Sequence, residues 1–216
     1  MLKYSSFLLL AFTLLFNNAE AQSSIDSTQI KKEFYSLDEA LKNPENVYRL
    51  TLSGQEIQVS DTVWSKFTNL QYLSLKNDHL KQIPSALGYI KTLKVLDLSG
   101  NDFKVLPSTF TNLSNLQELY INDDKYFNFE KNIPILSKLP NLTSLHLEND
   151  GLKSLPKNTS KLSHIESLYL NDNQFKHFPI DLNGFENLKY IDLHNNKYAM
   201  PPEEIENKNF GIKISF

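Results

Sequence analysis

Few side chains in this sequence are suited to acid–base or nucleophilic chemistry. The 216 residues include five histidines and no cysteine. The lack of cysteine excludes disulfides, thiolate zinc sites and a cysteine nucleophile. The sequence also contains no nucleophile elbow, phosphate-binding loop or H-E-x-x-H motif. An acid–base pair would therefore have to be assembled from histidines and carboxylates such as His146, Asp192 and His194.

The positions of these residues reflect a repeat. His146, Tyr169 and Asp192 follow one another at intervals of 23 residues, and the same interval recurs along the chain. Apolar residues open seven equivalent units, numbered one to seven below, at Val47, Leu70, Leu93, Leu116, Leu142, Ile165 and Leu188. The steps between them are 23, 23, 23, 26, 23 and 23 residues. A period this regular is the signature of a solenoid, in which each unit covers the apolar face of its neighbour.

Each unit begins with a pattern that predicts a short strand. Apolar residues occupy positions 1, 4, 6, 11, 14, 18 and 21 of the unit, as Leu96, Leu98, Phe103 and Leu106 do in unit three. Positions 4 and 6 lie two residues apart, so they point to one side of a strand while positions 3, 5 and 7 point to the other. The strand therefore has a core face and a free face.

Two polar or rigid positions predict how the chain leaves the strand. Position 9 carries Asn101, Asn173 and Asn196, or Asp78, Asp124 and Asp150, with Gln55 as a departure. Asparagine can bond the backbone groups of a turn as donor and acceptor, whereas aspartate only accepts, so we expect interruptions in an asparagine ladder at the aspartates. Position 15 is proline, which starts the outer side of the coil. These prolines are Pro84, Pro107, Pro134, Pro156, Pro179 and Pro202.

Residues 47–216 resemble the leucine-rich repeat family, in the 23-residue subtype L-x-x-L-x-L-x-x-N-x-L-x-x-L-P-x-x-h-x-x-L, where h is apolar. The resemblance implies an α/β fold, a solenoid shaped as a horseshoe. Its parallel β-sheet would line the concave face, and short helices or 3-10 turns would form the convex face. We expect seven repeats followed by a terminal edge strand.

The residues before the repeats predict two further segments. Residues 1–21 have a basic residue, an apolar stretch from Phe7 to Phe16 and the A-x-A motif ending at Ala21, which are the parts of a signal peptide. Residues 22–46 are expected to form a linker and an N-terminal cap helix, since Ser36 with Glu39 makes a capping box and Pro44 stops the segment. Leu37, Ala40 and Leu41 would cover the leucines of unit one.

Two irregular places remain. The 23-residue count brings Ile214 and Phe216 to positions 4 and 6 of an eighth strand, whose open edge offers a route to oligomerisation although charge on short edges commonly prevents it. Unit four contains three extra residues near Tyr126, Phe127 and Phe129. These aromatic side chains either form a contact loop or pack inward, and packing is the commoner fate.

The register places a polar and aromatic surface on the concave face. From unit four to unit seven it gathers Tyr120, His146, Tyr169, Tyr190, Asp192 and His194, which we call the concave patch. Exposed tyrosine provides a large contact area at low entropic cost, so the patch is the predicted ligand-binding site. The competing interpretation is that tyrosine and threonine occupy these positions only because they favour strands.

The predicted geometry is poor for catalysis or metal binding. Strands lie about 4.8 Å apart, which separates His146 from Asp192 by roughly 10 Å, and His194 follows Asp192 by roughly 7 Å along its strand. Two histidines on an open face supply too few ligands for a metal site. His79, His164 and His177 fall on turns or the return path and are expected to be solvated. No cofactor and no metal are predicted.

These observations favour a non-catalytic protein, secreted or periplasmic, that binds a protein or peptide through its concave face. A glycan is the alternative ligand. A net charge of -3 gives no field for nucleic acid, and no second hydrophobic span follows the predicted signal peptide. Two other functions stay open: an intracellular scaffold, if residues 1–21 are retained, and a hydrolase with an unrecognised site near His146 and Asp192.

Overall fold

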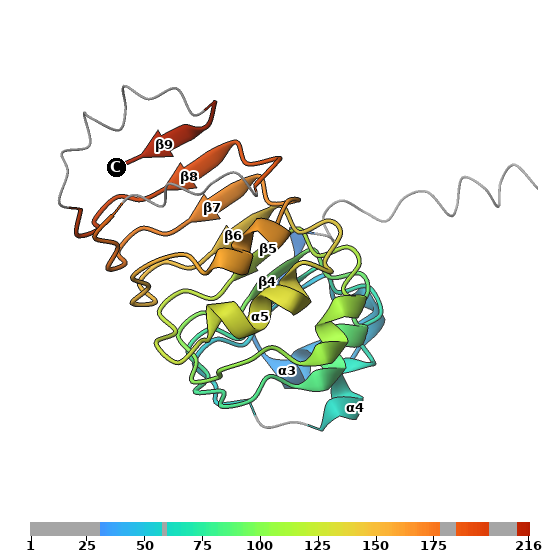
Figure 1. Ribbon diagram of the computed structural model, residues 1–216. Helices are drawn as coiled ribbons and strands as arrows, with labels where there is room; N and C mark the ends of the chain where they lie inside the picture. The colour runs from blue at the N-terminus through green and yellow to red at the C-terminus, as the bar shows by residue number, and fades with distance from the viewer. Residues whose placement is uncertain (1–30, 58–59, 178–184, 199–210) are drawn as a thin grey trace, which may run out of the picture.

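The computed structural model describes residues 31–57, 60–177, 185–198 and 211–216. The predicted cleavage site after Ala21 and the prolines Pro179 and Pro202 lie outside these residues. The described chain forms one parallel sheet of nine strands, which follow one another in sequence order (Figure 1). The strands are β1 (Glu33–Phe34), β2 (Arg49–Thr51), β3 (Tyr72–Ser74), β4 (Val95–Asp97), β5 (Glu118–Tyr120), β6 (Ser144–His146), β7 (Ser167–Tyr169), β8 (Tyr190–Asp192) and β9 (Lys213–Ser215).

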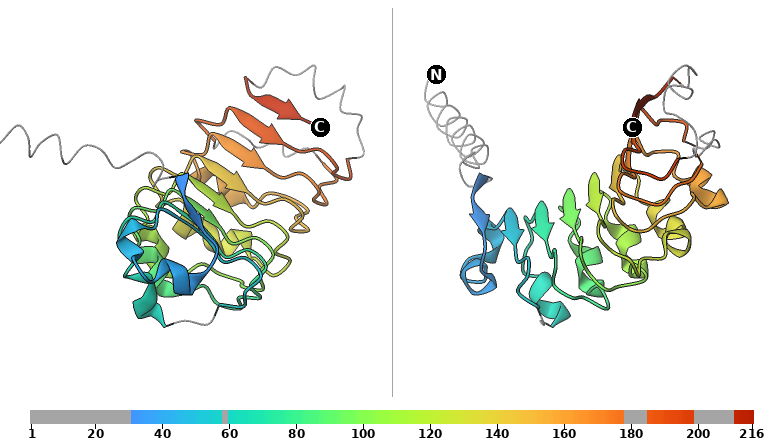
Figure 2. Two further views of the ribbon diagram at one scale, coloured as in Figure 1. Left: turned by 180° about the vertical axis from the view of Figure 1, so that it is seen from behind. Right: turned by 90° about the vertical axis from the view of Figure 1, so that its left-hand side faces the viewer.

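Helical segments occupy the other side of the coil. They are α3 (Leu37–Ala40), η1 (Pro44–Asn46), α4 (Asp61–Trp64), η2 (Ser85–Tyr89), η3 (Ser108–Asn112), α5 (Phe129–Leu136) and η4 (Lys157–Lys161), where η denotes a 3-10 helix. In Figure 2 the strands line the inner curve of an arc and the helical segments lie along its outer curve. The predicted α/β horseshoe, with its sheet on the concave face, is confirmed.

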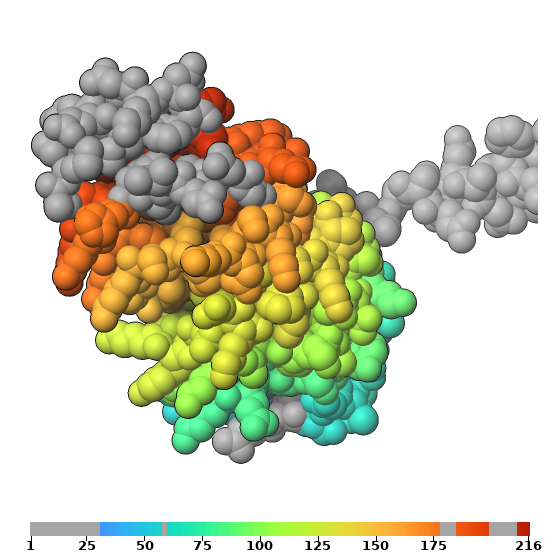
Figure 3. All heavy atoms as spheres, viewed as in Figure 1, coloured from blue at the N-terminus to red at the C-terminus, as the bar shows by residue number. Residues whose placement is uncertain are grey.

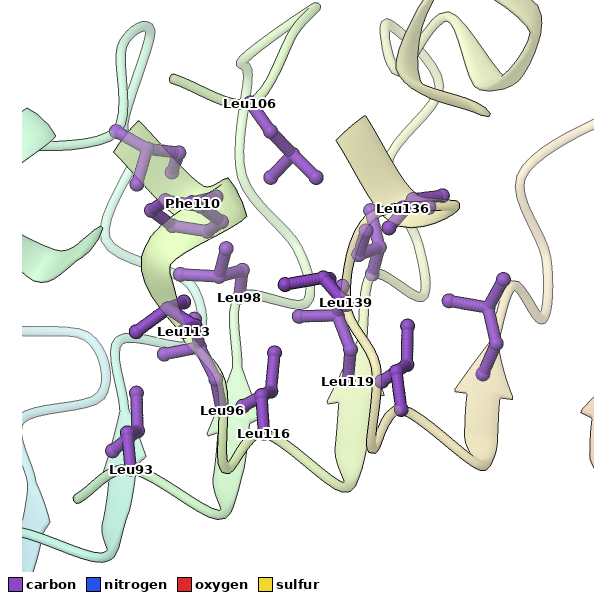
Figure 4. Packing of buried hydrophobic residues seen from close by; sticks show 14 of the residues in the cluster. Leu93, Leu96, Leu98, Leu106, Phe110, Leu113, Leu116, Leu119, Leu136 and Leu139 are labelled. Carbon is purple, nitrogen blue, oxygen red and sulfur yellow. The ribbon is translucent and has the colours of Figure 1, made fainter. Parts of the chain in front are cut away.

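The core runs the length of the coil between the sheet and the outer segments. Leu96, Leu98, Leu119 and Phe110 are fully buried, and each packs against side chains of the same or adjoining units (Figure 4). Successive units lie against one another as adjoining bands on the surface (Figure 3). Burying a leucine contributes about 1.5–3 kcal/mol, so repeating these positions in every unit supplies the main stabilisation.

Asparagine at position 9 joins neighbouring units as expected. Asn101 Oδ1 accepts hydrogen bonds from the amides of Asp78 and Leu80, at 3.2 and 2.9 Å, while its Nδ2 donates to the carbonyls of Leu75 and Leu98, at 2.8 and 2.7 Å. Aspartate at the same position accepts hydrogen bonds but donates none. Asp78 Oδ1 accepts from the amides of Gln55 and Glu56, and Asp78 Oδ2 has no hydrogen-bond partner among the described residues. The predicted interruption of the ladder is therefore present.

Position 8 carries a second turn signal that the sequence reasoning missed. Its backbone has a positive φ in all seven units, at Gly54, Asn77, Gly100, Asp123, Asn149, Asp172 and Asn195. Glycine, asparagine and aspartate are the residues that adopt this left-handed conformation at least cost. At Gly100 a Cβ atom would also lie 1.9 Å from Asn77 Oδ1, so the side chain of Asn77 would have to move to admit it.

Of the expected linker and cap helix at residues 22–46, the structure describes residues 31–46. Ser36 does cap α3, accepting a long hydrogen bond of 3.5 Å from the Glu39 amide, and Ala40 is fully buried. Before α3, however, the chain forms the additional strand β1, which pairs with β2. Glu33 supports this pairing because its Oε1 accepts a hydrogen bond from the Thr51 hydroxyl and its Oε2 lies 3.7 Å from Arg49 Nε.

Unit four departs most from the repeat. Its extra residues allow a regular helix, α5, so Pro134 lies inside a helix, whereas Pro84, Pro107 and Pro156 directly precede 3-10 helices as predicted. Inward packing, the commoner of the two expected fates, occurs for two of its three aromatic residues, and a contact role for the third stays a prediction. Phe127 and Phe129 are buried, while Tyr126 is 59% exposed.

The C-terminal strand β9 is present and pairs in parallel with β8, with Ile214 opposite Ile191. It is the last strand of the described sheet. Whether its edge mediates oligomerisation stays a prediction.

Candidate functional site

The concave patch is organised around an aromatic stack. The strand register places Tyr120 opposite His146 and His146 opposite Tyr169. The ring centroids of Tyr120 and His146 are 3.9 Å apart, and those of His146 and Tyr169 are 4.0 Å apart, with interplanar angles of 20° and 5°. Tyr190 continues the row at 5.4 Å from Tyr169, tilted by 59°. Strand spacing near 4.8 Å brings such rings within stacking distance.

Both edges of the His146 ring contact carboxylates. Nε2 lies 3.1 Å from Glu118 Oε1, and Nδ1 lies 3.2 Å from Glu148 Oε1. Tyr120 donates a hydrogen bond of 2.8 Å from its hydroxyl to the same Glu118 oxygen. With a ring on each face and a carboxylate at each edge, His146 is only 7% exposed. The residue predicted to lie on an open face instead holds the stack together.

Asp192 organises the end of the patch near the C-terminus. Tyr190 donates to Asp192 Oδ2 at 3.1 Å, and Asp192 Oδ1 lies 2.6 Å from His194 Nδ1. The expected separation of roughly 7 Å between the two residues is wrong for their side chains, because that spacing describes backbone positions. The Asp192 carboxylate also accepts the His194 amide at 3.2 Å, which folds position 7 back toward position 5.

The tyrosine hydroxyls of the patch remain proton donors at neutral pH. Burial, followed by hydrogen bonding to Glu118 and the charge of that carboxylate, raises the pKa of Tyr120 well above its ordinary value. Burial and the charges of Glu118, Glu148 and Asp192 raise the pKa of Tyr169. A ligand group facing these hydroxyls would therefore meet neutral phenols and negatively charged carboxylates.

Charge is distributed unevenly along the concave face. The concave positions of β4 to β8 carry Asp97, Glu118, Glu148 and Asp192, and they contain no lysine or arginine. Cationic side chains lie toward the ends of the sheet. Arg49 Cζ is 4.1 Å from the ring centroid of Tyr72, and Lys213 Nζ is 5.7 Å from the ring centroid of Tyr190. The middle of the face is acidic and aromatic.

The structure thus brings the six predicted residues into one continuous row with two subclusters. Tyr120, His146 and Tyr169 form one, and Tyr190, Asp192 and His194 form the other. Sequence reasoning left Glu118 and Glu148 out of the patch. Their position on the same free face could have identified them. Glu118 lies on β5, which pairs with the strand of His146, and Glu148 follows His146 by two residues.

The two histidines of the concave patch contact carboxylates. Among the described residues, no hydrogen bond joins the ring of His146 or His194 to a serine or threonine hydroxyl, and both nitrogens of His146 already contact carboxylates. His164 was expected to be solvated but is partly buried, and burial lowers its pKa.

Neither a metal site nor a membrane span is found in the described part of the chain. There, no group of three or more histidine, aspartate or glutamate side chains is placed to hold a metal ion. The helices of the described residues are too short or too polar to span a membrane.

Solved structures share this fold at low sequence identity. A leucine-rich repeat protein of Leptospira interrogans is 24% identical over 85% of this chain and 57% of its own length, with a TM-score of 0.58. An internalin of Listeria monocytogenes is 20% identical over 79% of this chain and 47% of its own length, with a TM-score of 0.58. In the Toll–Spätzle complex of Drosophila, the matching chain is 18% identical over 75% of this chain and 22% of its own length, with a TM-score of 0.63. The chain thus spans about half the length of the first two proteins.

Family models match most of the repeats. A model described as a leucine-rich repeat region matches residues 49–139, and a second leucine-rich repeat model matches residues 140–197. A comparison with curated protein sequences finds no match. The two matches meet end to end over the strands that carry the buried leucines and the concave patch, and the chain belongs to the leucine-rich repeat proteins.

Proposed function

We propose that this chain is a non-catalytic recognition protein that acts outside the cytoplasm and binds a protein partner through the concave patch. Leucine-rich repeat proteins generally bind proteins, and a rigid curved sheet favours many shallow contacts over a deep pocket. Compartment and binding face are both part of the proposal. The predicted signal peptide at residues 1–21 supports the compartment.

The observation that carries the proposal is the row of rings from Tyr120 to Tyr190, held by carboxylates. Because Glu118 and Glu148 fix His146, and His146 fixes the rings on either side, the row is ordered before any partner arrives. Preorganised aromatic side chains lose little entropy on binding. The surrounding acidic charge favours a partner segment that carries lysine or arginine, which can pair with the carboxylates and stack on the tyrosine rings.

The test begins with the partner, captured by crosslinking from the native cell surface or periplasm and then purified. We expect Tyr190→Ala, and the double change Tyr120→Ala with Tyr169→Ala, to weaken its binding at least tenfold, because central aromatic residues dominate interface energies. Tyr89→Ala is the matched control, since Tyr89 is 63% exposed on η2, on the convex side. Isothermal titration calorimetry measures all four proteins. Equal affinity for the wild type and the two concave variants would refute the concave interface.

Salt concentration tests the predicted charge of the partner. Raising the ionic strength from about 0.1 M to about 1 M shortens the screening length from about 10 Å to about 3 Å. Binding of a basic segment to the acidic patch should then weaken, mainly through a slower association rate. Affinity that is unchanged or stronger in high salt would argue for an apolar or acidic partner instead.

Protein chemistry tests the compartment separately. We expect the mature protein from the native cell to begin at Gln22, the residue after the predicted cleavage site. N-terminal sequencing of protein from culture medium, periplasm and cytoplasm distinguishes the outcomes. A cytoplasmic protein that begins at Met1 would favour the intracellular scaffold.

A further inference from the structure

A second surface with binding character lies beside the concave face, where the chain leaves the strands. Two adjoining hollows of about 330 and 680 Å³ share Lys81 as a lining residue. Together we call them the lateral groove, defined by Ile57, Leu80, Lys81, Lys104, Val105 and Tyr126. These residues come from units one to four in order, so the groove crosses four successive units of the coil.

The groove exposes apolar side chains that the fold holds in place. Val105 is 50% exposed and Tyr126 is 59% exposed, although both belong to segments with buried neighbours. Phe127, next to Tyr126, packs edge-on against Phe103 with ring centroids 5.7 Å apart, and Phe129 is buried at the start of α5. The inserted loop is therefore anchored immediately after Tyr126. Val105 and Tyr126 line the same hollow, so an apolar side chain of a partner that entered it would contact both.

The charge of the groove is positive on its side nearer the insertion. Lys81 and Lys104 occupy position 12 of units two and three, and both are exposed. Within the described chain, neither lysine forms an ion pair. Asp102 lines the same hollow as both lysines, and its Oδ2 lies 3.6 Å from His79 Nδ1, whereas Glu56 and Asp78 line the smaller hollow away from the insertion. Equivalent positions of successive units are about 5 Å apart, so the positive potentials of the two lysines add and attract an anion.

We infer that the lateral groove binds an extended segment of a partner protein in which an acidic residue stands beside an apolar or aromatic anchor. The acidic side chain would lie between Lys81 and Lys104, and the anchor would pack against Val105 and Tyr126. Crossing four units takes three steps of about 5 Å, which gives a path of about 15 Å, the span of roughly five extended residues. This site goes beyond the proposed concave interface and has the opposite charge preference.

A displayed library of random hexapeptides, selected on the full chain, tests the inference. We expect selected peptides to carry aspartate or glutamate next to phenylalanine, tyrosine or leucine. A fluorescent synthetic peptide of the consensus sequence should bind the wild type. It should bind the double variant Lys81→Glu with Lys104→Glu, and separately Tyr126→Ala, at least tenfold more weakly by fluorescence anisotropy. All three substitutions are on exposed side chains, so folding should be retained.

The chain itself offers a matched control. Lys153 and Lys176 occupy the same position 12 in units five and six, are exposed, and do not line either hollow. Lys153→Glu with Lys176→Glu makes the same change in net charge and should leave peptide affinity within about twofold, as should Tyr190→Ala on the concave face. These results would separate the groove from a general attraction to lysines and from the concave interface.

Three results would overturn the inference. The first is selection that yields no class of peptides combining acidic and apolar residues. The second is an equal loss of affinity in the two lysine pairs, or a loss with Tyr190→Ala. The third is self-association in sedimentation experiments that Lys81→Glu with Lys104→Glu abolishes, because the groove would then bind a second copy of this chain.

Discussion

The hydrogen bonds of a single side chain in this protein depend on which groups the neighbouring unit places beside it. Asn173 and Asp150 occupy the same position of successive units, but only the asparagine can donate to the carbonyls of Leu147 and Leu170. Asp150 instead accepts the Asp124 amide at 2.8 Å, and its Oδ2 has no hydrogen-bond partner among the described residues. Burial, assisted by the charges of Asp124 and nearby acidic residues, raises the pKa of Asp150 to about 9. This carboxyl group is therefore protonated at neutral pH.

The raised pKa makes stability depend on pH. Between the unfolded pKa near 4 and the folded pKa of about 9, the folded state binds more protons, so the free energy of unfolding falls as pH rises. The slope reaches up to about 1.4 kcal/mol per pH unit. We expect Asp150→Asn to remove most of this slope, which denaturant titrations from pH 5 to pH 9 measure. Burial also raises the pKa of Asp124 to about 7, so a slope of similar size from this second group should remain in Asp150→Asn, but only between about pH 4 and pH 7.

Asp172→Asn serves as the control for this experiment. Asp172 is exposed, and hydrogen bonds from Asn171 and Asn195 lower its pKa. Its replacement should bring no gain in stability at alkaline pH. If Asp150→Asn followed the pH dependence of the wild type, the assignment of a buried, protonated carboxyl group would be wrong.

At the scale of elements, the irregular unit shows how an insertion is accommodated. Three extra residues replace a 3-10 turn with α5, and Asn132 on this helix ties it to unit three. Asn132 is fully buried, its Oδ1 accepts the Leu106 amide at 2.7 Å, and its Nδ2 donates to the Lys104 carbonyl at 3.0 Å. One side chain of the helix therefore satisfies two backbone groups of unit three, an amide and a carbonyl.

Replacing Asn132 should therefore be costly. Asn132→Leu leaves the buried Leu106 amide without an acceptor, which costs about 1–3 kcal/mol. Urea unfolding monitored by circular dichroism measures the change. Asn115→Leu is the comparison, because Asn115 is exposed and bonds only one carbonyl, that of Lys91 at 2.8 Å, and should cost less than about 1 kcal/mol. A similar loss in both variants would show that α5 is not held by Asn132.

At the scale of the whole molecule, each unit contacts chiefly the units before and after it. The strands pair only with their sequence neighbours, from β1 to β9. Stability in such a coil is close to a sum of unit terms and nearest-neighbour terms. A defect in one unit should consequently weaken the units next to it more than those at the ends.

Leu119 provides a test of this behaviour. It is fully buried in β5 at the middle of the sheet, and Leu119→Ala should lower the free energy of unfolding by about 2–5 kcal/mol. Hydrogen exchange of the backbone amides should accelerate most in β4, β5 and β6 and least in β2 and β8. Uniform acceleration along the sheet would show instead that the coil unfolds as one cooperative unit.

The sequence alone determined the repeat, the order and register of the strands from β2 to β9, the buried leucines and the residues that share the concave face. A fixed period is enough for these features because it places equivalent residues about 5 Å apart on neighbouring strands. Period also predicted the interrupted asparagine ladder, since the chemistry of Asn and Asp differs at one repeated position.

Only the tertiary structure decided how the side chains at these positions are used. His146 is buried because two tyrosine rings and Glu118 from the adjacent strands converge on it together with Glu148 of its own unit. Tyr126 is exposed because its neighbour Phe127 packs against Phe103. The additional strand β1 likewise depends on pairing with Arg49 and Leu50. A period specifies which positions are neighbours, whereas burial and side-chain contacts depend on the rotamers and shapes of the residues that meet there, whether from the same unit or from adjoining units.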